Sequence, residues 1–182
     1  DQVKELIDEV GLDYYKQSTK EFIEEGRRAQ LTRVQQLMVP GRYRGHTFYG
    51  HLTEGKPGIL PMGDENLLYA IPLELEVKGD GHMHLDFEGT GSWGYHSMNC
   101  TPAGMDGGLF VTLTQHMNYE GKVNDGAWLA TDMNLPLGTW TNPDRHTVAT
   151  ATSWALLLPA FGIFQRLLSR GFISRGFKEE AF

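Results

Sequence analysis

Residues 71–87, Ile-Pro-Leu-Glu-Leu-Glu-Val-Lys-Gly-Asp-Gly-His-Met-His-Leu-Asp-Phe, decide what kind of fold this chain can adopt. On both sides of Gly79-Asp80-Gly81, a sequence typical of a tight turn, apolar side chains occupy every second position. Because successive side chains of a strand point to opposite faces, this alternation predicts two strands that each bury one face. The stretch therefore predicts an antiparallel β-hairpin. Pro72 suits the start of a strand or an edge, because it has no backbone N–H to donate.

The first 39 residues are helical in character. Apolar residues at helical spacing predict a first helix, and these residues are Val3, Leu6, Ile7 and Val10. Gly11 can end this helix, and Asp13 is the expected N-cap of a second helix that stops before Pro40. We therefore expect residues 1–39 to form a helical segment.

Residues 40–146 are predicted to form a sheet-rich core segment that contains one helix. Weak alternation over Arg42–Thr53 predicts another strand. Trp128–Met133 is expected to be a short extended stretch. Gly89–Gly104 is rich in glycine and is expected to be a loop, while Gly108–Tyr119 is expected to be the helix.

Residues 147–182 begin with an apolar stretch, Val148–Leu168. A membrane span needs about 20 continuous apolar residues, whereas polar side chains interrupt this stretch and Pro159 breaks or kinks a helix. We expect a buried helix and a tail that pack on missing chain or on a partner, with no membrane contact. The predicted fold is thus α+β, with a central antiparallel sheet on which the N-terminal helices and the later helices pack.

Composition limits the classes of function. A chain of 182 residues can bury one real core, and its net charge of -7 argues against nucleic acid as a partner. Cys100 is the single cysteine, so an intrachain disulfide is excluded. The residues after Asp1 lack the pattern of a signal peptide, and we expect a cytoplasmic protein. The two ends have the character of an interrupted chain, which suggests a segment of a larger subunit.

One short pattern could bind a metal ion. His82, His84, Asp86 and Glu88 share one face of the predicted strand, and imidazole and carboxylate groups are ligands of Mn, Fe or Zn. Neighbours on one face of a strand lie ~7 Å apart, so two of them can share a metal but three rarely can. The alternative is that these four residues are the solvated face of the hairpin.

A second candidate is Cys100 with the nearby His96 as a nucleophile and its base, against the simpler interpretation that Cys100 is a small core residue. The other histidines are scattered along the chain, and they are His46, His51, His116 and His146. The chain has no phosphate-loop consensus, no G-x-S-x-G elbow and no H-E-x-x-H pair.

The order of several short motifs is more specific than any one of them. Pro40-Gly-Arg-Tyr43 precedes the hairpin, and Leu85-Asp-Phe-Glu-Gly-Thr90 follows its turn. Further motifs then come in the order Asn99-Cys-Thr-Pro102, Asn124-Asp-Gly126 and Pro136-Leu-Gly-Thr-Trp-Thr-Asn-Pro143. In this order the chain resembles the middle of the hydantoinase B / oxoprolinase / acetone carboxylase large-subunit family. The residues of these motifs are most similar to those of acetone carboxylase alpha subunits. The chain departs from the family pattern at Trp93-Gly-Tyr-His96.

The resemblance implies a segment of the alpha subunit of an ATP-dependent, biotin-independent ketone carboxylase, which converts acetone and bicarbonate to acetoacetate. It implies manganese in the parent subunit, bound outside this segment, and ATP bound on a partner subunit. The implied partners are an ATP-binding beta subunit and a small gamma subunit of a heterohexamer, with a small ketone and bicarbonate as substrates. The isolated segment is expected to be inactive.

The resemblance assigns no catalytic residue and no metal ligand in this chain. The hypothesis that His82 and His84 bind a metal therefore depends on the strand pattern alone. Polar residues of the shared motifs and their surroundings are expected to line a pocket, and these candidates are Asp86, Thr90, Asn99, Asn124 and Asp125. Two alternatives stay open: the B component of an ATP-dependent hydantoinase or 5-oxoprolinase-type amidohydrolase, and a non-catalytic subunit-assembly module. A self-contained metalloenzyme built on His82 and His84 is the remaining alternative.

Overall fold

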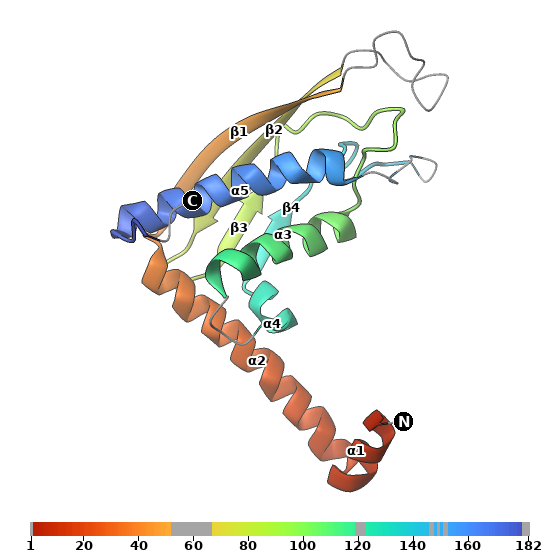
Figure 1. Cartoon of the computed structure of the whole chain (residues 1–182), viewed down its shortest axis with the longest axis vertical. Coiled ribbons are helices and arrows are strands. Elements are labelled where there is room, and N and C mark those ends of the chain that lie inside the picture. Colours follow the sequence, from red (N-terminus) through yellow and green to blue (C-terminus); the bar gives the residue numbers. More distant parts are fainter. Residues whose placement is uncertain are drawn as a thin grey trace.

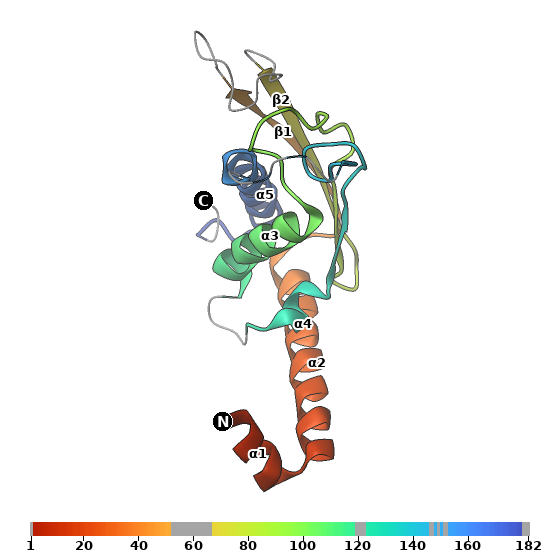
Figure 2. The ribbon, with the colours of Figure 1, turned by 90° about the vertical axis from the view of Figure 1, so that its right-hand side faces the viewer.

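The computed structural model describes residues 2–51, 67–118, 123–145, 148, 150 and 153–179. A four-stranded sheet in the order β1-β2-β3-β4 carries α3 and α5 on one of its faces (Figure 1 and Figure 2). The helices are α1 (Gln2–Val10), α2 (Leu12–Leu37), α3 (Pro102–Met117), α4 (Asp125–Trp128) and α5 (Trp154–Arg175). The strands are β1 (Gly41–His51), β2 (Leu67–Val77), β3 (Met83–Asp86) and β4 (Thr131–Asn134). The α+β class that the sequence predicts is confirmed.

The predicted hairpin is present as β2 and β3, which pair antiparallel with Val77 opposite Met83. β1 pairs antiparallel with β2 on the other side, and Pro72 lies in a part of β2 that pairs with β1 but not with β3. β4 instead pairs parallel to β3, so the sheet is mixed where the sequence predicted antiparallel pairing. The chain passes through α3 and α4 between these two strands, and a connection of that length allows parallel pairing.

The core lies between one face of the sheet and the two long helices on it. Every second residue of β2 is buried on that face, and these residues are Tyr69, Ile71, Leu73, Leu75 and Val77. Apolar side chains of α5 cover them, among them Ile163, Phe164 and Leu167, which are at most 1% exposed. Burying one such side chain stabilises a fold by roughly 1.5–3 kcal/mol, which makes this layer the main source of stability.

The apolar stretch predicted at Val148–Leu168 corresponds to a helix shifted toward the C-terminus, and this helix packs on the chain's own β1 and β2, where the sequence suggested missing chain or a partner. Helix α5 begins at Trp154 and continues through Pro159 to Arg175, so the proline neither breaks nor ends it. Among the described residues, α5 is the helix long and apolar enough to span a membrane, yet 56% of that window is buried in the protein. A helix that is apolar and buried against a sheet in this way is typical of a protein core.

Two helix starts differ from the sequence prediction. Gly11, not Asp13, occupies the N-cap of α2, because the helix already begins at Leu12. Helix α3 begins at Pro102 rather than Gly108, because the Thr101 side chain accepts a hydrogen bond from the Gly104 amide at 3.1 Å. Proline at the first helical position then suits the backbone. Thr53 and Tyr119, the predicted ends of a strand and of a helix, lie outside the described residues.

Helices α2 and α4 touch backbone to backbone. Asn124 caps α4 by accepting from the Gly126 amide at 2.9 Å, and its side-chain amide donates to the Phe22 carbonyl oxygen of α2 at 2.8 Å. A Cβ at Gly126 would overlap the Ile23 carbonyl oxygen, and one at Gly26 would overlap the Asn124 side chain. The Asn-Asp-Gly motif therefore forms a joint between the two helices, and glycine is needed on both sides of it.

We expect Gly126→Ala to destabilise the fold by about 1–3 kcal/mol, because the new methyl group must push α4 away from a rigid backbone oxygen. Gly107→Ala is the matched control, since nothing lies within 4 Å of a Cβ at that exposed position of α3. This control should stabilise by up to about 1 kcal/mol, because alanine favours helix more than glycine does. Denaturant unfolding measures both effects, and equal stabilities of the two variants would contradict the joint.

Candidate functional site

The polar residues predicted to line one pocket lie in three separate places. Asp86 ends β3 on the open face of the sheet, and Thr90 and Asn99 lie in the loop that joins β3 to α3. Asn124 and Asp125 begin α4, and the hydrogen bonds of the Asn124 side chain hold α4 on α2. The structure thus brings Thr90 and Asn99 into one buried loop and gives Asn124 a role at a helix joint.

Asn99 organises that loop from its centre. Its side chain is fully buried, and its amide group donates to the Gly94 carbonyl oxygen at 2.8 Å and to the His96 carbonyl oxygen at 2.9 Å. Its own carbonyl oxygen accepts from the Gly94 amide at 3.0 Å. The Asn99 side chain therefore makes the hydrogen bonds to backbone groups that a neighbouring strand would otherwise make, and these bonds fix the position of His96.

His96 forms a buried pair with Tyr69 of β2. The Met98 amide donates to Nδ1 of His96 at 3.1 Å, so the ring proton of the neutral imidazole belongs on Nε2. Nε2 then donates to the Tyr69 hydroxyl oxygen. The two side chains are 7% and 6% exposed, and a Cβ at Gly94 would collide with both. Glycine at this position is therefore what allows the tyrosine and the histidine to meet.

Two further polar groups are buried close to this loop. The Trp140 amide donates to the Gly91 carbonyl oxygen at 3.1 Å, which places Trp140 beside the residue that follows Thr90. Neither the Thr90 hydroxyl nor the Trp140 indole N–H has a hydrogen-bond partner among the described residues. The loop therefore gathers four groups that can donate or accept hydrogen bonds, and they are Tyr69, Thr90, His96 and Trp140. We call these residues, together with Asn99, the loop cluster.

The loop cluster can hold and transfer protons, because imidazole and phenol are the donors and acceptors of general acid–base chemistry. Of these residues, His96, Thr90 and Asn99 were candidates from the sequence, whereas Tyr69 and Trp140 were not. Tyr69 follows the same alternation as Ile71 and Leu73, so its hydroxyl had to be buried and had to find a partner. That alternation is the signal that could have revealed it.

Cys100 has the environment of a core residue. It is fully buried, and its burial raises the pKa of the thiol above its ordinary value, which disfavours the nucleophilic thiolate. Both ring nitrogens of His96 are bonded, to Met98 and to Tyr69, rather than to the thiol. The proposed pair of Cys100 with His96 as its base is therefore not present.

The open face of the sheet carries the residues considered as metal ligands. His82 binds Asp80 at 3.2 Å from Nδ1, and Asp86 accepts from the Asn134 side chain at 2.7 Å and from the Glu88 amide at 3.0 Å. Over the ranges that the structure describes, no three side chains of His, Cys, Asp or Glu come together as a metal site requires. A metalloenzyme built on His82 and His84 receives no support from this geometry.

The same face is a surface of ion pairs. Arg42 lies 3.5 Å from Glu74 and from Glu76, and Arg44 pairs with Glu74. A shallow hollow of about 380 Å³ lies between Arg44, His46 and the Asp86 region. Because these pairs are exposed to water, each contributes at most about 1 kcal/mol, and the solvated-face interpretation of the hairpin fits them. Of the other histidines, His146 and the His51 side chain lie outside what the structure describes.

The chain is similar to known proteins along almost its whole length. A model of the Hydantoinase B/oxoprolinase family matches residues 1–176. The acetone carboxylase alpha subunit of Xanthobacter autotrophicus (strain ATCC BAA-1158 / Py2) is 35% identical over 98% of this chain and 23% of its own length. The structure of nucleotide-free acetone carboxylase, from work on ATP-dependent acetone carboxylation, superposes with a TM-score of 0.92. That structure is 33% identical over 98% of this chain and 24% of its own.

A second solved structure shares the fold. The ATP-dependent caprolactamase from Pseudomonas jessenii has a TM-score of 0.63 and 18% identity over 87% of this chain and 27% of its own. At that identity the likeness concerns the fold alone. The chain thus spans about a quarter of the length of the relatives it matches.

We expect Asn99→Ala to destabilise the protein by about 2–4 kcal/mol, because it removes three buried hydrogen bonds and leaves backbone groups of Gly94 and His96 short of partners. Asn134→Ala is the matched control, because that exposed side chain makes one bond to Asp86, and its loss should cost about 0.5 kcal/mol or less. Denaturant unfolding of both variants measures the difference. A cost for Asn99→Ala no larger than the control's would show that the loop does not depend on this side chain.

Stability should also fall in acid because of His116 on α3. Burial lowers the pKa of His116 below its ordinary value of 6.5, and the Gln165 side chain donates to Nε2 at 2.9 Å. The folded state therefore keeps the neutral ring, and below pH 6.5 the unfolded chain binds more protons than the folded one. The wild type should lose stability relative to His116→Gln as the pH falls below 6.5, with no such change above it. Parallel stability curves of the two proteins across this range would be the contradicting result.

Proposed function

Because the chain belongs to the hydantoinase B/oxoprolinase family, we propose that it is a segment of the alpha subunit of an ATP-dependent, biotin-independent ketone carboxylase. The proposed reaction joins acetone and bicarbonate to give acetoacetate. One observation carries this proposal: the 35% identity to an acetone carboxylase alpha subunit, spread over 98% of the chain. The TM-score of 0.92 supports it, since it means that the layers and loops of the two proteins correspond.

The chemistry of the proposed reaction explains why such a segment is needed. A ketone must lose a proton from its α-carbon, and the resulting enolate attacks CO2 to form the new carbon–carbon bond. ATP activates the reactants on a partner subunit, and the activated forms must be kept from water. A rigid, buried wall serves that purpose, and the loop cluster supplies one from this chain.

Within this wall, Asn99 holds the loop and His96 holds a proton on Nε2 against the Tyr69 oxygen. The hydroxyl of Thr90 and the indole N–H of Trp140 are buried groups without partners among the described residues. Such groups cost free energy unless a ligand or water satisfies them, which supports a place at the edge of a reaction chamber.

Manganese, which the family resemblance implies for the parent subunit, has no fitting ligand set among the described residues. The carboxylate of Asp86 is engaged by Asn134 and Glu88, and His82 is engaged by Asp80. We therefore propose that the ligands of the metal lie outside this segment. The beta and gamma subunits of a heterohexamer remain the proposed partners. The proposed location is the cytoplasm, which supplies ATP and bicarbonate.

An amidohydrolase of the hydantoinase or 5-oxoprolinase type is the second candidate. The family description names these activities, and the fold of an ATP-dependent caprolactamase is similar. The two reactions differ in one measurable demand, since carboxylation consumes bicarbonate and ring opening of an amide consumes water.

A non-catalytic assembly role stays a further proposal for α5. Leu157 of this helix is 3% exposed, so Leu157→Glu would damage the core rather than report on a partner. Leu158 and Trp154 are each 56% exposed and face outward from the same helix. Leu158→Glu is therefore the substitution that tests binding of the other subunits.

We expect the complex that contains the full-length subunit to form acetoacetate only when acetone, bicarbonate and ATP are all present. Labelled bicarbonate followed into acetoacetate measures this, and omission of each reactant in turn is the control. The 182-residue chain alone should form none. Opening of hydantoin or 5-oxoproline without bicarbonate would assign the amidohydrolase instead, and turnover by the isolated chain would contradict the segment proposal.

A further inference from the structure

The hydrogen bonds of the loop cluster run in one direction. The backbone amide of Met98 can only donate, and it donates to Nδ1 of His96 at 3.1 Å. The proton of the neutral imidazole therefore lies on Nε2, which donates to the hydroxyl oxygen of Tyr69. The hydroxyl proton of Tyr69 then points away from His96. The tyrosine is a stronger donor for this, because its oxygen already accepts a hydrogen bond.

Two glycines bring the loop onto this tyrosine. A Cβ at Gly91 would lie 3.2 Å from the Tyr69 ring, and one at Gly94 would overlap the hydroxyl oxygen. Thr90 precedes Gly91 in the chain, and the Trp140 amide donates to the Gly91 carbonyl oxygen at 3.1 Å. The segments that carry Tyr69, Thr90 and Trp140 therefore meet at one glycine.

Thr90 and Trp140 each bury a polar group that has no partner. Thr90 is 8% exposed and Trp140 is fully buried. Within the part of the chain that the structure describes, the Thr90 hydroxyl and the Trp140 indole N–H make no hydrogen bond. An indole N–H can only donate, and a hydroxyl can donate as well as accept. Because an unsatisfied buried donor costs free energy, the two groups indicate a ligand that brings acceptor atoms.

The residue types of the loop cluster favour a negatively charged oxygen as that acceptor. Tyr69, Thr90 and Trp140 can each present a donor, and the five members of the cluster include no carboxylate. A carboxylate would repel an anion, whereas preorganised neutral donors stabilise one. The cluster thus has the composition of a site for an oxyanion.

Charged residues beside the loop do not oppose an anion. Asp144 is exposed, and one of its carboxylate oxygens accepts from the Trp93 indole at 2.7 Å. Arg145 lies over the same indole ring, 5.5 Å from its centroid, and donates to the Tyr95 hydroxyl at 3.3 Å. The acid next to the loop is therefore accompanied by a cation of equal charge.

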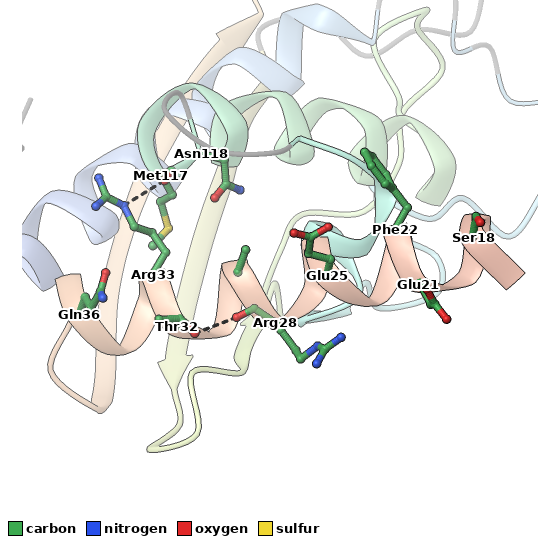
Figure 3. A pocket seen from close by; sticks show the side chains of 11 residues that line it. Ser18, Glu21, Phe22, Glu25, Arg28, Thr32, Arg33, Gln36, Met117 and Asn118 are labelled. Atoms are coloured by element: carbon green, nitrogen blue, oxygen red, sulfur yellow. Dashed lines mark hydrogen bonds between the residues drawn. The ribbon is translucent and has the colours of Figure 1, made fainter.

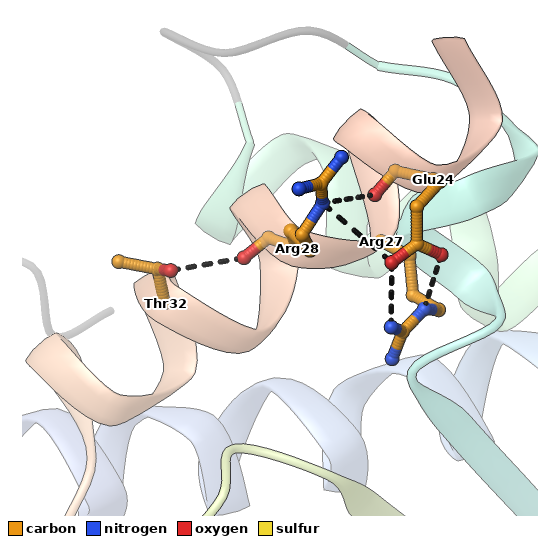
Figure 4. A network of polar contacts seen from close by, with 4 residues as sticks. All are labelled: Glu24, Arg27, Arg28 and Thr32. Carbon is orange, nitrogen blue, oxygen red and sulfur yellow. Dashed lines mark hydrogen bonds and ion pairs between the residues drawn. The ribbon is translucent and has the colours of Figure 1, made fainter. Parts of the chain in front are cut away.

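Another buried donor without a partner has different surroundings. The Asn118 amide nitrogen makes no hydrogen bond to a described residue, and Asn118 lines a hollow along α2 (Figure 3). The two acids and two arginines that line this hollow balance, and they are Glu21, Glu25, Arg28 and Arg33. Arg27 beside them binds Glu24 at 2.7 and 2.8 Å (Figure 4). That hollow selects neither sign of charge, whereas the loop cluster offers donors without a carboxylate.

We propose that Tyr69, Thr90 and Trp140 bind a negatively charged oxygen of the reactants, and that His96 is the positioning residue that orients the Tyr69 hydroxyl. The proposed reaction supplies such an oxygen twice, on the enolate of the ketone and on the carboxylate of the product. Both are oxyanions on a planar carbon, so the same donors suit them. The inference rests on the proposed function in taking the loop cluster as part of the reaction chamber.

Binding of acetoacetate to the complex that contains the full-length subunit tests the donors. Isothermal titration without ATP measures the affinity, and acetoacetamide, which has nearly the same shape but no charge, is the reference ligand. Benzothienylalanine in place of Trp140 replaces the indole N–H by sulfur and keeps the ring shape. We expect this replacement and Tyr69→Phe each to weaken acetoacetate binding by at least about tenfold, and acetoacetamide binding by less than about twofold.

Matched controls lie outside the loop cluster. Benzothienylalanine at Trp128 removes an indole N–H that donates to Asp106 at 3.1 Å, and Tyr43→Phe removes a hydroxyl that donates to the Val39 carbonyl oxygen at 2.6 Å. Both controls should leave the two affinities unchanged. No acetoacetate binding by the unmodified complex, or unchanged binding after both replacements in the cluster, would overturn the proposal. So would an equal loss for the two ligands, because it would indicate damage to the fold.

Variants of His96 test its positioning role. His96→Leu should weaken acetoacetate binding as Tyr69→Phe does, and His96→Gln, which keeps an N–H donor, should restore most of it. In the Tyr69→Phe background, His96→Leu should have no further effect, because His96 acts through the tyrosine. Additive losses would overturn this role. These titrations need no turnover, so a complex that opens hydantoin instead of carboxylating acetone would overturn the proposed function alone, whereas unchanged acetoacetate binding would overturn the oxyanion site alone.

Discussion

The contact between β2 and α5 is the constraint on which the rest of the structure depends. β2 presents an unbroken row of buried apolar side chains to one side, and this is the side that an apolar helix has to cover, whereas Glu74 and Glu76 lie on the other side. Helix α5 supplies that cover from the far end of the chain. Once these two elements meet, α3 is held beside α5 and the charged face of the sheet stays in water. The position of the loop cluster follows, because Tyr69 belongs to the same buried row.

The sequence predicted the parts of the fold whose signal is local. The hairpin was visible in its alternation and its glycine turn, and α5 in its composition. The start of α3 was missed because its cap, Thr101, stands inside a stretch whose glycines indicate a loop. The parallel pairing of β4 was missed because it depends on the path of the chain through α3 and α4, which no periodicity records. The continuity of α5 through Pro159 shows packing overriding a local preference for a break.

The candidate site was predicted only in part, for a similar reason. Thr90 and Asn99 were named from motifs, and both lie in the buried loop. The pairing of Tyr69 with His96 joins residues 27 positions apart and depends on the absence of a Cβ at Gly94, so sequence spacing could not reveal it. Asn124 was expected in a pocket, yet its two hydrogen bonds make a helix joint. Short motifs shared within a family can therefore mark places where backbones meet as well as places where substrates bind.

The glycine joint between α2 and α4 has a mechanical consequence. The joint spans Phe22, Ile23 and Gly26, so α1 and the part of α2 before Phe22 act as a lever with its fulcrum where the two backbones touch. From Phe22 to Leu12 the lever measures roughly 15 Å, and a tilt of about 10° at the joint would carry its tip nearly 3 Å. A displacement of that size is about the width of one side chain. A shift of α4 would therefore displace the N-terminal end of α2 relative to any surface that lies against it.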